Sequence, residues 1–557
     1  MRKYRCSPIQ LPDHRIATDM SMTPQEAFAR SQSGFAAYRD HRFVDAESVA
    51  DAILAGLPKD PNGLYLKAIC RRARQDRTAA LHWIKQACDA APGQLGFELA
   101  AAQILGDLKE FDAARSRFKA IADAFPTAVD PHLMRGLLER QVGDLDAARQ
   151  AYQQALDLSE TNIEARRGLA WVCENQRDWA SARIHADAVL ASEPTDPVAL
   201  SARSGADMAD GKPEAARTLI ETQFDASRST ASHNASVWRR LGDACEAMGD
   251  HEAAFSAWEA GYGALREHLA PGGQFLDEMH GLDSLKRLKT AYGKLSPPKS
   301  GSAPEGRSPI FLVGFPRSGT TLLEQILASH SAVTSSDEAA LLQPILDEAG
   351  DSTESLRRFF AALPRNRARL QSEYWERVDR MATPGSAVFI DKLPLNLPWL
   401  GVIGHVFPNA RIILALRDPR DAVFSTFKRL FRLNTAMLRT YTLADTVALY
   451  EAAMAAADAG RRIAPDLRVT ELRYEDLVID MKDEIARVLL ALGLEWESEM
   501  ADYRERLSPS LSTPSAPQVE QAIHDKAIGA WRHQAAALAP YADQLAPWVT
   551  RWRYPER

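Results

Sequence analysis

The sequence predicts a chain of several domains, in which an all-α superhelix of repeats precedes an α/β domain with a parallel sheet. Three observations indicate this architecture. The chain has 557 residues, about three to four times a typical domain length. Its first half repeats every 34 residues. Its second half contains short apolar strands that each lead into a polar loop, and two of these loops are followed by a helix.

The overall composition restricts the class of protein. Hydrophobic residues at 46% and charged residues at 25% are close to the average of soluble globular proteins, which argues against a disordered or fibrous chain. A net charge of -7 does not suit a protein that coats nucleic acid or anionic lipid. The basic N-terminus lacks the apolar core of a signal peptide, and no eighteen apolar residues run together. We therefore expect a cytoplasmic protein with neither nucleic acid nor a membrane as partner.

The cysteines bear on the chemistry that the chain can perform. There are five, Cys6, Cys70, Cys88, Cys173 and Cys245, and none forms a CxxC pair. We expect them to be reduced and mostly buried. All lie in the first half, so the chemistry of the second half is expected to use neither a thiol nor a cysteine-held metal.

The repeat is defined by Ala-Ala-Arg segments that end at Arg115, Arg149 and Arg217, with Ala182-Arg183 at the matching place between them. Prolines recur in the same register at positions 58, 92, 126 and 194. This 34-residue period resembles the tetratricopeptide repeat, a helix-turn-helix unit that stacks into a superhelix. The resemblance implies about seven repeats over residues 24–268, preceded by an N-terminal extension, residues 1–23.

Other residues fit the repeat pattern. We expect close helix crossings at Gly136 and Gly242 and large second-helix residues at Phe118 and Tyr152. The last unit comes four residues late, so one loop near residues 227–234 is expected to be longer. A stack of this kind usually binds a peptide, a partner protein or a second copy of itself in its groove, and the sequence leaves these open. Recruitment of a polypeptide acceptor and homodimerisation are both hypotheses.

A connecting helix and a Pro/Ser/Gly-rich linker are predicted over residues 269–308, before an α/β domain at 309–557. That domain opens with an apolar strand at 309–313, a glycine loop and a helix. This order aims backbone N–H groups and a helix N-terminus at an anion. The loop residues with donors to an anion are Arg317, Ser318, Gly319, Thr320 and Thr321. Thr320 stands where a Walker loop has its lysine, so a nucleoside triphosphatase is not favoured.

A second anion site is predicted after the strand at 411–416. Arg417 follows this strand at its carboxyl end, where open α/β sheets bind ligands. Ser425 and Arg429 are four residues apart on the next helix and so share one face. These three side chains can converge on a further phosphate. Two separate sites suggest a nucleotide that carries phosphates at two places.

The segments 315–321 and 417–425 together resemble the 5′-phosphosulfate loop and the 3′-phosphate motif of sulfotransferases. These enzymes use 3′-phosphoadenosine 5′-phosphosulfate (PAPS). The chain is most similar to protein-tyrosine sulfotransferases and their bacterial relatives with tetratricopeptide repeats, over residues 309 to about 535. The resemblance implies a P-loop-like α/β domain, PAPS as the sulfuryl donor, and no metal.

The resemblance also assigns individual residues. The family's catalytic glutamate falls on Glu338, the lysine that interacts with the transferring group falls on Lys392, and Tyr474 matches a tyrosine that contacts the nucleotide. Ser515 matches a serine that donates to the cofactor or the sulfuryl group. The family has a basic residue before a tryptophan where this chain has Ala530; Lys526 and Arg532 are candidates to replace it. His330 is a rival base but aligns with a structural turn.

The leading interpretation is therefore a PAPS-dependent enzyme that sulfates a hydroxyl, most simply a peptide tyrosine, with Glu338 as general base and Arg317, Lys392 and Ser515 in catalytic roles. Small-molecule, sugar and lipid hydroxyls remain alternative acceptors. A nucleotide kinase or NTPase is disfavoured by Thr320. A non-catalytic repeat scaffold is the third alternative.

Overall fold

The structure is a computed structural model that describes residues 22–228, 230–270, 280–296, 307–382, 387–429, 439–506 and 523–555. The chain forms two compact units, Met1–Asp210 and Gly211–Arg557. The boundary between them lies within the predicted repeat region. Most of the predicted Pro/Ser/Gly-rich linker, residues 297–306, lies outside the described residues.

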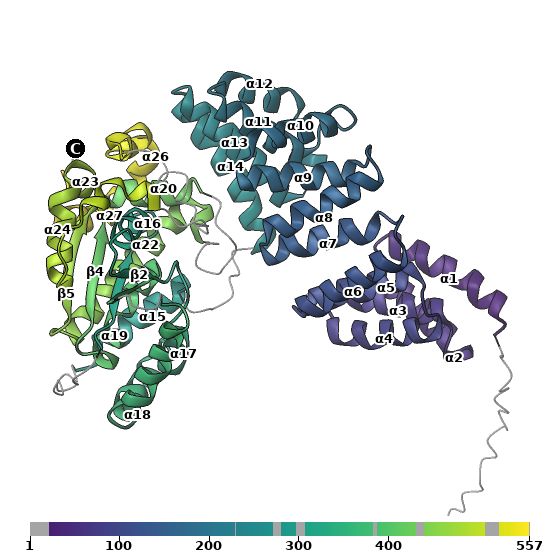
Figure 1. The fold of residues 1–557 in the computed structure, drawn as a ribbon, viewed down its shortest axis with the longest axis horizontal. Coiled ribbons are helices and arrows are strands. Elements are labelled where there is room, and N and C mark those ends of the chain that lie inside the picture. The colour runs from purple at the N-terminus through teal and green to yellow at the C-terminus, as the bar shows by residue number, and fades with distance from the viewer. Residues whose placement is uncertain are drawn as a thin grey trace, which may run out of the picture. The chain divides into compact units, whose positions relative to one another are not determined.

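The first unit consists of successive helix pairs (Figure 1). Its helices are α1 (Pro24–Arg39), α2 (Phe43–Gly56), α3 (Pro61–Ala73), α4 (Arg77–Ala90), α5 (Leu95–Asp107), α6 (Phe111–Ala124), α7 (Asp130–Val142), α8 (Leu145–Leu158), α9 (Ile163–Gln176), α10 (Trp179–Leu190) and α11 (Pro197–Ala209). Each helix packs against the next along the chain, and the first helix of each pair also packs against the first helix of the following pair. This is the arrangement of a repeat stack.

The predicted period is confirmed by the helix starts. The second helices of the pairs begin at residues 43, 77, 111, 145, 179 and 213, each 34 residues after the one before. The fourth residue of each is a fully buried alanine, namely Ala46, Ala80, Ala114, Ala148, Ala182 and Ala216. Because alanine adds only a methyl group, neighbouring helices can approach closely at these positions. The repeat is therefore built on small residues at a fixed register.

Gly136 is one of the predicted close crossings, and the structure shows why it lacks a side chain. A Cβ atom added at Gly136 would lie 2.6 Å from the ring of Tyr152, and one added at Gly168 would also lie 2.6 Å from this ring. Tyr152 itself is almost fully buried. One aromatic ring thus fills the space that two glycines leave open.

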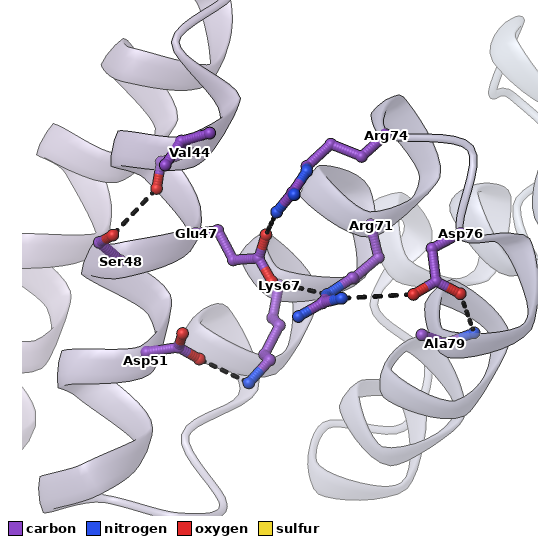
Figure 2. Close-up of polar contacts among 9 residues, drawn as sticks. All are labelled: Val44, Glu47, Ser48, Asp51, Lys67, Arg71, Arg74, Asp76 and Ala79. Carbon is purple, nitrogen blue, oxygen red and sulfur yellow. Dashed lines mark hydrogen bonds and ion pairs between the residues drawn. The ribbon is translucent and has the colours of Figure 1, made fainter.

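Ion pairs join the first two helix pairs of the stack (Figure 2). Glu47 of α2 is 5% exposed, and its two carboxylate oxygens lie 2.6 Å from Nε of Arg71 and 2.6 Å from a terminal nitrogen of Arg74, both on or next to α3. Asp51, one turn further along α2, pairs with Lys67 but is 53% exposed. The two carboxylates on one helix face therefore differ chiefly in burial.

Glu47→Gln should lower the free energy of unfolding by about 2 kcal/mol, because it weakens two charge-assisted contacts of a buried carboxylate. Asp51→Asn is the matched control and should cost less than about 0.5 kcal/mol, since exposed ion pairs contribute little. Urea unfolding monitored by circular dichroism measures both. Equal losses in the two variants would contradict this ranking.

The second unit begins with the last repeat helices, α12 (Pro213–Gln223), α13 (Ala231–Ala247) and α14 (His251–Leu269), and continues with α15 (Leu282–Gly293). Helix α14 starts 38 residues after α12, so the last repeat is late by four residues, as predicted. A short 3-10 helix, η1 (Ala226–Arg228), lies in the longer loop. A Cβ atom on Gly242 would lie 2.3 Å from Nε1 of Trp258, so the second predicted close crossing is also present.

A parallel sheet follows, with its helices on both faces. The strands are β1 (Ile310–Gly314), β2 (Val333–Ser335), β3 (Val388–Lys392), β4 (Arg411–Leu416) and β5 (Arg468–Arg473). Its α-helices are α16 (Thr320–Ala328), α17 (Gln343–Ala349), α18 (Thr353–Asp379), α19 (Leu400–Val406), α20 (Pro419–Phe427), α22 (Leu443–Ile463), α23 (Tyr474–Ile479), α24 (Met481–Leu492), α26 (Ala535–Leu538) and α27 (Ala542–Arg551). Its 3-10 helices are η3 (Pro394–Trp399), η4 (Arg439–Tyr441), η5 (Ser498–Arg506), η6 (Asp525–Ala527), η7 (Ala530–Gln534) and η8 (Ala539–Tyr541).

Within the described residues the strands pair in the order β2-β3-β1-β4-β5, all parallel. Alternate residues of β1 belong to two different apolar clusters. Phe311 and Val313 join the cluster formed with α15, α18, α19 and α22, whereas Ile310 and Leu312 join the one formed with α16 and α24. Because successive side chains of a strand point to opposite faces, the sheet is covered on both. The predicted α/β domain with a parallel sheet is confirmed.

The last repeat pair lies in the second unit because its aromatic residues share that unit's core. Trp258 of α14 packs against Phe424, and Tyr262 packs against Phe427. The Tyr262 hydroxyl donates a hydrogen bond to the carbonyl of Lys428 at 3.1 Å. Repeat helix and α/β domain therefore form one continuous core at this end of the stack.

Candidate active site

The predicted anion-binding residues follow two neighbouring strands. β1 and β4 lie side by side. The chain runs from β1 to β2, which is the edge strand on one side of the sheet, and from β4 to β5, which is the edge strand on the other side. In open parallel sheets this divergence leaves a crevice at the carboxyl ends of the two strands, where ligands bind. Arg317 comes shortly after β1, and Arg417 directly follows β4.

The loop after β1 has a backbone that requires glycine at one position and is strained at another. Gly319 has a φ of 89°, and a Cβ atom there would lie 2.7 Å from the ring of Tyr474. Arg317 also lies in the left-handed region, with a φ of 68°. Residues with a side chain adopt this conformation rarely, and such strained residues recur at functional sites. Gly319 is followed directly by the first turn of α16.

The structure brings together most of the residues predicted to bind the cofactor. Nε of Arg317 donates a hydrogen bond to Oγ of Ser425 at 3.2 Å. Arg417 donates to the carbonyl oxygen of Arg317 at 3.0 Å, and its guanidinium lies 4.8 Å from the centroid of the Tyr474 ring. Ser318 of the same loop is buried, as are Thr320 and Thr321 in the first turn of α16.

The electrostatics of this cluster favour an anionic ligand. Burial, together with the charges of Arg429 and Arg417, lowers the pKa of Arg317 to about 9. Within the described residues, Nε of Arg417 and Nε of Arg429 are buried without a hydrogen-bond partner. Three guanidinium groups this close repel one another, and a bound anion would relieve that repulsion. The donor set suits phosphate and sulfate oxygens.

A second cluster lies at the carboxyl end of β3. Nζ of Lys392 lies 2.8 Å from Oε1 of Glu338 and 3.0 Å from Oε2 of Glu324. The Lys392 side chain is fully buried, whereas the side chain of Glu338 is 36% exposed. The predicted base and the predicted lysine are therefore in direct contact, and the base alone of the two is open to solvent.

The backbone holds Glu338 in an unusual conformation. Asp337 and Glu338 have φ values of 43° and 66°, both in the left-handed region. The Glu338 N–H donates to the carbonyl of Lys392 at 3.1 Å, and the Lys392 N–H donates to Oγ of Ser336 at 2.8 Å. These bonds tie the turn after β2 to the end of β3. A strained turn held in this way is typical of a functional site.

Asp391 precedes Lys392 and is fully buried, with the Tyr374 hydroxyl donating to its Oδ2 at 3.2 Å. Burial raises the pKa of Asp391 to about 7. This folded-state pKa lies above the unfolded value of 3.8. As the pH rises, Asp391 therefore loses its proton at a lower pH in the unfolded state than in the folded state. The stabilisation from this group is full below about pH 4 and is lost as the pH rises toward 7.

Asp391→Asn should therefore raise the free energy of unfolding at pH 8 by about 2–4 kcal/mol and change it little at pH 4. Denaturant titrations at several pH values measure the difference. Asp379→Asn, which removes an exposed carboxylate at the end of α18, is the control and should shift neither curve. A difference between Asp391→Asn and the wild type that does not depend on pH would contradict the expectation.

Three carboxylates at the site were not predicted. Glu324 contacts Lys392, Asp421 accepts hydrogen bonds from the N–H groups of Gly529 and Trp531 at 2.7 Å each, and Glu475 accepts one from the Asp418 N–H at 2.9 Å. Asp421 thereby holds a C-terminal segment against α20. A signal for Glu324 exists in the sequence, since it is a charge among leucines and isoleucine in a helix that follows a buried strand.

Of the other predicted residues, Ser515 lies outside the described residues. The segment that carries Lys526, Ala530 and Arg532 reaches the site, because the carbonyl of Ala527 accepts a hydrogen bond from Arg417 at 2.7 Å. His330 has its ring nitrogens occupied by backbone: Nδ1 accepts from the Ala332 N–H at 3.0 Å, and Nε2 lies 3.0 Å from the Glu495 carbonyl. Those contacts suit a turn and not a base.

In the described part of the chain, none of the helices is both long and apolar enough to cross a lipid bilayer. Nor do three or more of its His, Cys, Asp and Glu side chains gather in a way that could hold a metal ion.

Parts of both halves of the chain match known protein families. Residues 309–498 match the model of the sulfotransferase family. Residues 99–163 and 139–205 match models of the tetratricopeptide repeat.

Similar proteins are distant relatives. The chain is 27% identical over 262 residues to an uncharacterized protein of Aquifex aeolicus, which covers 45% of this chain but only 34% of that protein. It is 26% identical over 234 residues to a putative protein-tyrosine sulfotransferase of Caenorhabditis briggsae, covering 40% of this chain and 80% of that one. It is 32% identical over 123 residues to an omega-hydroxy-beta-dihydromenaquinone-9 sulfotransferase of Mycobacterium bovis, covering 21% of this chain and 32% of that protein.

The matched sulfotransferase segment contains β1 to β5 together with Arg317, Glu338, Lys392 and Arg417. The repeat matches fall on helices of the first unit whose starts follow the 34-residue period. The chain therefore carries tetratricopeptide repeats that are followed along the sequence by a sulfotransferase-family domain.

Proposed function

We propose that this sulfotransferase uses PAPS as its donor and sulfates a hydroxyl group, with a tyrosine of a polypeptide as the acceptor. One observation carries the proposal: Arg317 after β1, Arg417 after β4 and Arg429 after α20 form a cluster of cations, and it lies at the carboxyl end of the same parallel sheet as the buried Lys392 and its partner Glu338. An anion site and a base are the two things that sulfuryl transfer to a hydroxyl needs.

The residues around Arg317 fit the phosphates of such a donor. The loop N–H groups, Arg317 and the start of α16 would hold the 5′-phosphosulfate. Arg417, Ser425 and Arg429 would hold the 3′-phosphate, and Tyr474 would contact the nucleotide. The buried Nε atoms of Arg417 and Arg429 leave donors for these groups. When bound, PAPS supplies the sulfuryl group and an adenosine 3′,5′-bisphosphate leaving group.

Glu338 would act as the general base. A tyrosine hydroxyl has a pKa of about 10 and is mostly protonated at neutral pH, so its proton must be removed as the oxygen attacks sulfur. The Glu338 carboxylate would take that proton as the acceptor oxygen replaces the phosphate oxygen on sulfur. Lys392 places its positive charge where negative charge develops during transfer. Ser515 is proposed to assist as a donor.

The acceptor is proposed from similarity and from domain content. A protein-tyrosine sulfotransferase is among the relatives, and tetratricopeptide repeats generally mediate protein–protein interactions. We propose that the repeat groove recruits the polypeptide acceptor or a second copy of this chain. The relative named for a dihydromenaquinone substrate favours a lipid hydroxyl as the second candidate acceptor.

The test uses the full chain with radiolabelled PAPS and, in separate reactions, a tyrosine peptide library, hydroxylated quinol lipids and sugars. Label transferred to peptide, located on tyrosine by mass spectrometry, supports the proposal, and label on lipid supports the second candidate. ATP hydrolysis without sulfate transfer would indicate an NTPase. Thermal stabilisation by adenosine 3′,5′-bisphosphate with no transfer to any acceptor would indicate a binding scaffold.

A further inference from the structure

Lys392 contacts two carboxylates that differ in access. Glu324 of α16 is fully buried and lies 3.0 Å from Nζ, and Glu338 lies 2.8 Å from the same nitrogen but is 36% exposed. A helix that follows the phosphate loop and a turn that follows β2 thus converge on one lysine. Of the two partners, the exposed one can meet an acceptor.

This asymmetry matters when a base takes up a proton. If Lys392 had Glu338 as its single partner, protonating Glu338 would leave a buried ammonium without a carboxylate, which is strongly unfavourable. With Glu324 in place, the ammonium keeps a carboxylate partner whichever state Glu338 is in. Burial would lower the pKa of Lys392, but Glu324 and then Glu338 raise it above its ordinary value.

We propose that Glu324 is a positioning residue that holds Lys392 in place from α16 and balances its charge, so that Glu338 can take up the acceptor proton. This inference rests on the proposed function. It links the phosphate loop to the base through a single helix, because Glu324 lies five residues after Gly319. Substrate binding at the loop and proton transfer at Glu338 then share one rigid element.

The first arm of the test does not depend on activity. Titration of the Lys392 side chain is followed by NMR of protein labelled with ¹³C in its lysine ε-carbons, with the signal assigned from Lys392→Arg. In Glu324→Gln the titration midpoint of Lys392 should move to lower pH, because one of its two carboxylates is gone. An unchanged midpoint would overturn the proposal.

The second arm is kinetic. Glu324→Gln should lower kcat by roughly 10- to 100-fold, because Lys392 is misplaced and its unbalanced charge holds Glu338 more firmly as the anion. The KM for PAPS should change little. For the same reason the acidic limb of the kcat–pH profile should move to lower pH. A residue with a purely structural role would lower the melting temperature and leave the position of that limb unchanged, and such a result would overturn the proposal.

Two further variants keep the test interpretable. Glu324→Asp keeps the charge and should restore part of kcat. Glu47→Gln removes the charge of another buried, ion-paired carboxylate in the first unit, and it should leave both the Lys392 midpoint and kcat unchanged. If the wild type transfers no sulfate to any acceptor, the proposed function fails, and the NMR arm still decides whether Glu324 holds Lys392.

Discussion

Glu338→Gln is expected to lower kcat by about 10²- to 10⁴-fold, the contribution typical of a positioned general base. Glutamine has nearly the same shape as glutamate and can still contact Lys392, so the loss should come from the missing basic oxygen. The affinity for adenosine 3′,5′-bisphosphate should stay within about twofold, because Glu338 contacts Lys392 and not the arginine cluster. Transfer of labelled sulfate under saturating PAPS measures kcat, and calorimetry measures the affinity.

The matched control is Glu354→Gln, which removes an exposed carboxylate in the first turn of α18 and should leave kcat unchanged. Glu338→Asp keeps a base but draws it back from Lys392, and it should give an intermediate rate. Full activity in Glu338→Gln would remove Glu338 as the base. Equal losses of kcat and of nucleotide affinity would instead indicate that the variant disturbs the whole site.

Arg417→Ala is expected to raise the Kd for adenosine 3′,5′-bisphosphate by about 30- to 4,000-fold, as for other buried charge pairs that lose one partner. Arg417 is 7% exposed, donates to the carbonyls of Arg317 and Ala527, and stacks on Tyr474. Its removal therefore takes away a cation and loosens both the loop after β1 and the segment around Ala527. Isothermal calorimetry at fixed ionic strength measures the change.

Arg411→Ala is a close control because Arg411 begins the same strand, β4, at its opposite end. Its guanidinium donates to the carbonyl of Ala491, away from the cluster, and its loss should leave the Kd unchanged. Arg417→Lys keeps the charge but not the planar fork and should recover part of the affinity. If Arg417→Ala bound the bisphosphate as tightly as the wild type, Arg417 would have no part in holding it.

Features that depend on local periodicity could be predicted from the sequence. The 34-residue register reproduced the starts of the second helices, and the apolar runs at 309–313 and 411–416 became the neighbouring strands β1 and β4. The rule that ligands bind at the carboxyl ends of parallel strands predicted a cation after each of these strands, but it did not predict the direct contacts of Arg317 with Arg417 and Ser425. The roles of these residues in catalysis stay predictions.

Features that depend on long-range contacts could not be predicted in this way. Nothing in the repeat pattern indicated that α13 and α14 would join the second unit, because this depends on Trp258 and Tyr262 meeting aromatic rings of α20. The hydrogen bonds from the N–H groups of Gly529 and Trp531 to Asp421 join residues more than a hundred positions apart. Such pairs leave no spacing rule in a single sequence.

The sequence by itself determined the order of the elements, the repeat period and the positions of the cations that follow β1 and β4, because these follow from side-chain chemistry and from the spacing of helices and strands. The tertiary structure alone decided which carboxylates Lys392 meets. Glu324 and Glu338 reach that lysine from different elements, and one is buried while the other is open. Burial depends on the packing of the whole domain, and it is burial that distinguishes these two carboxylates.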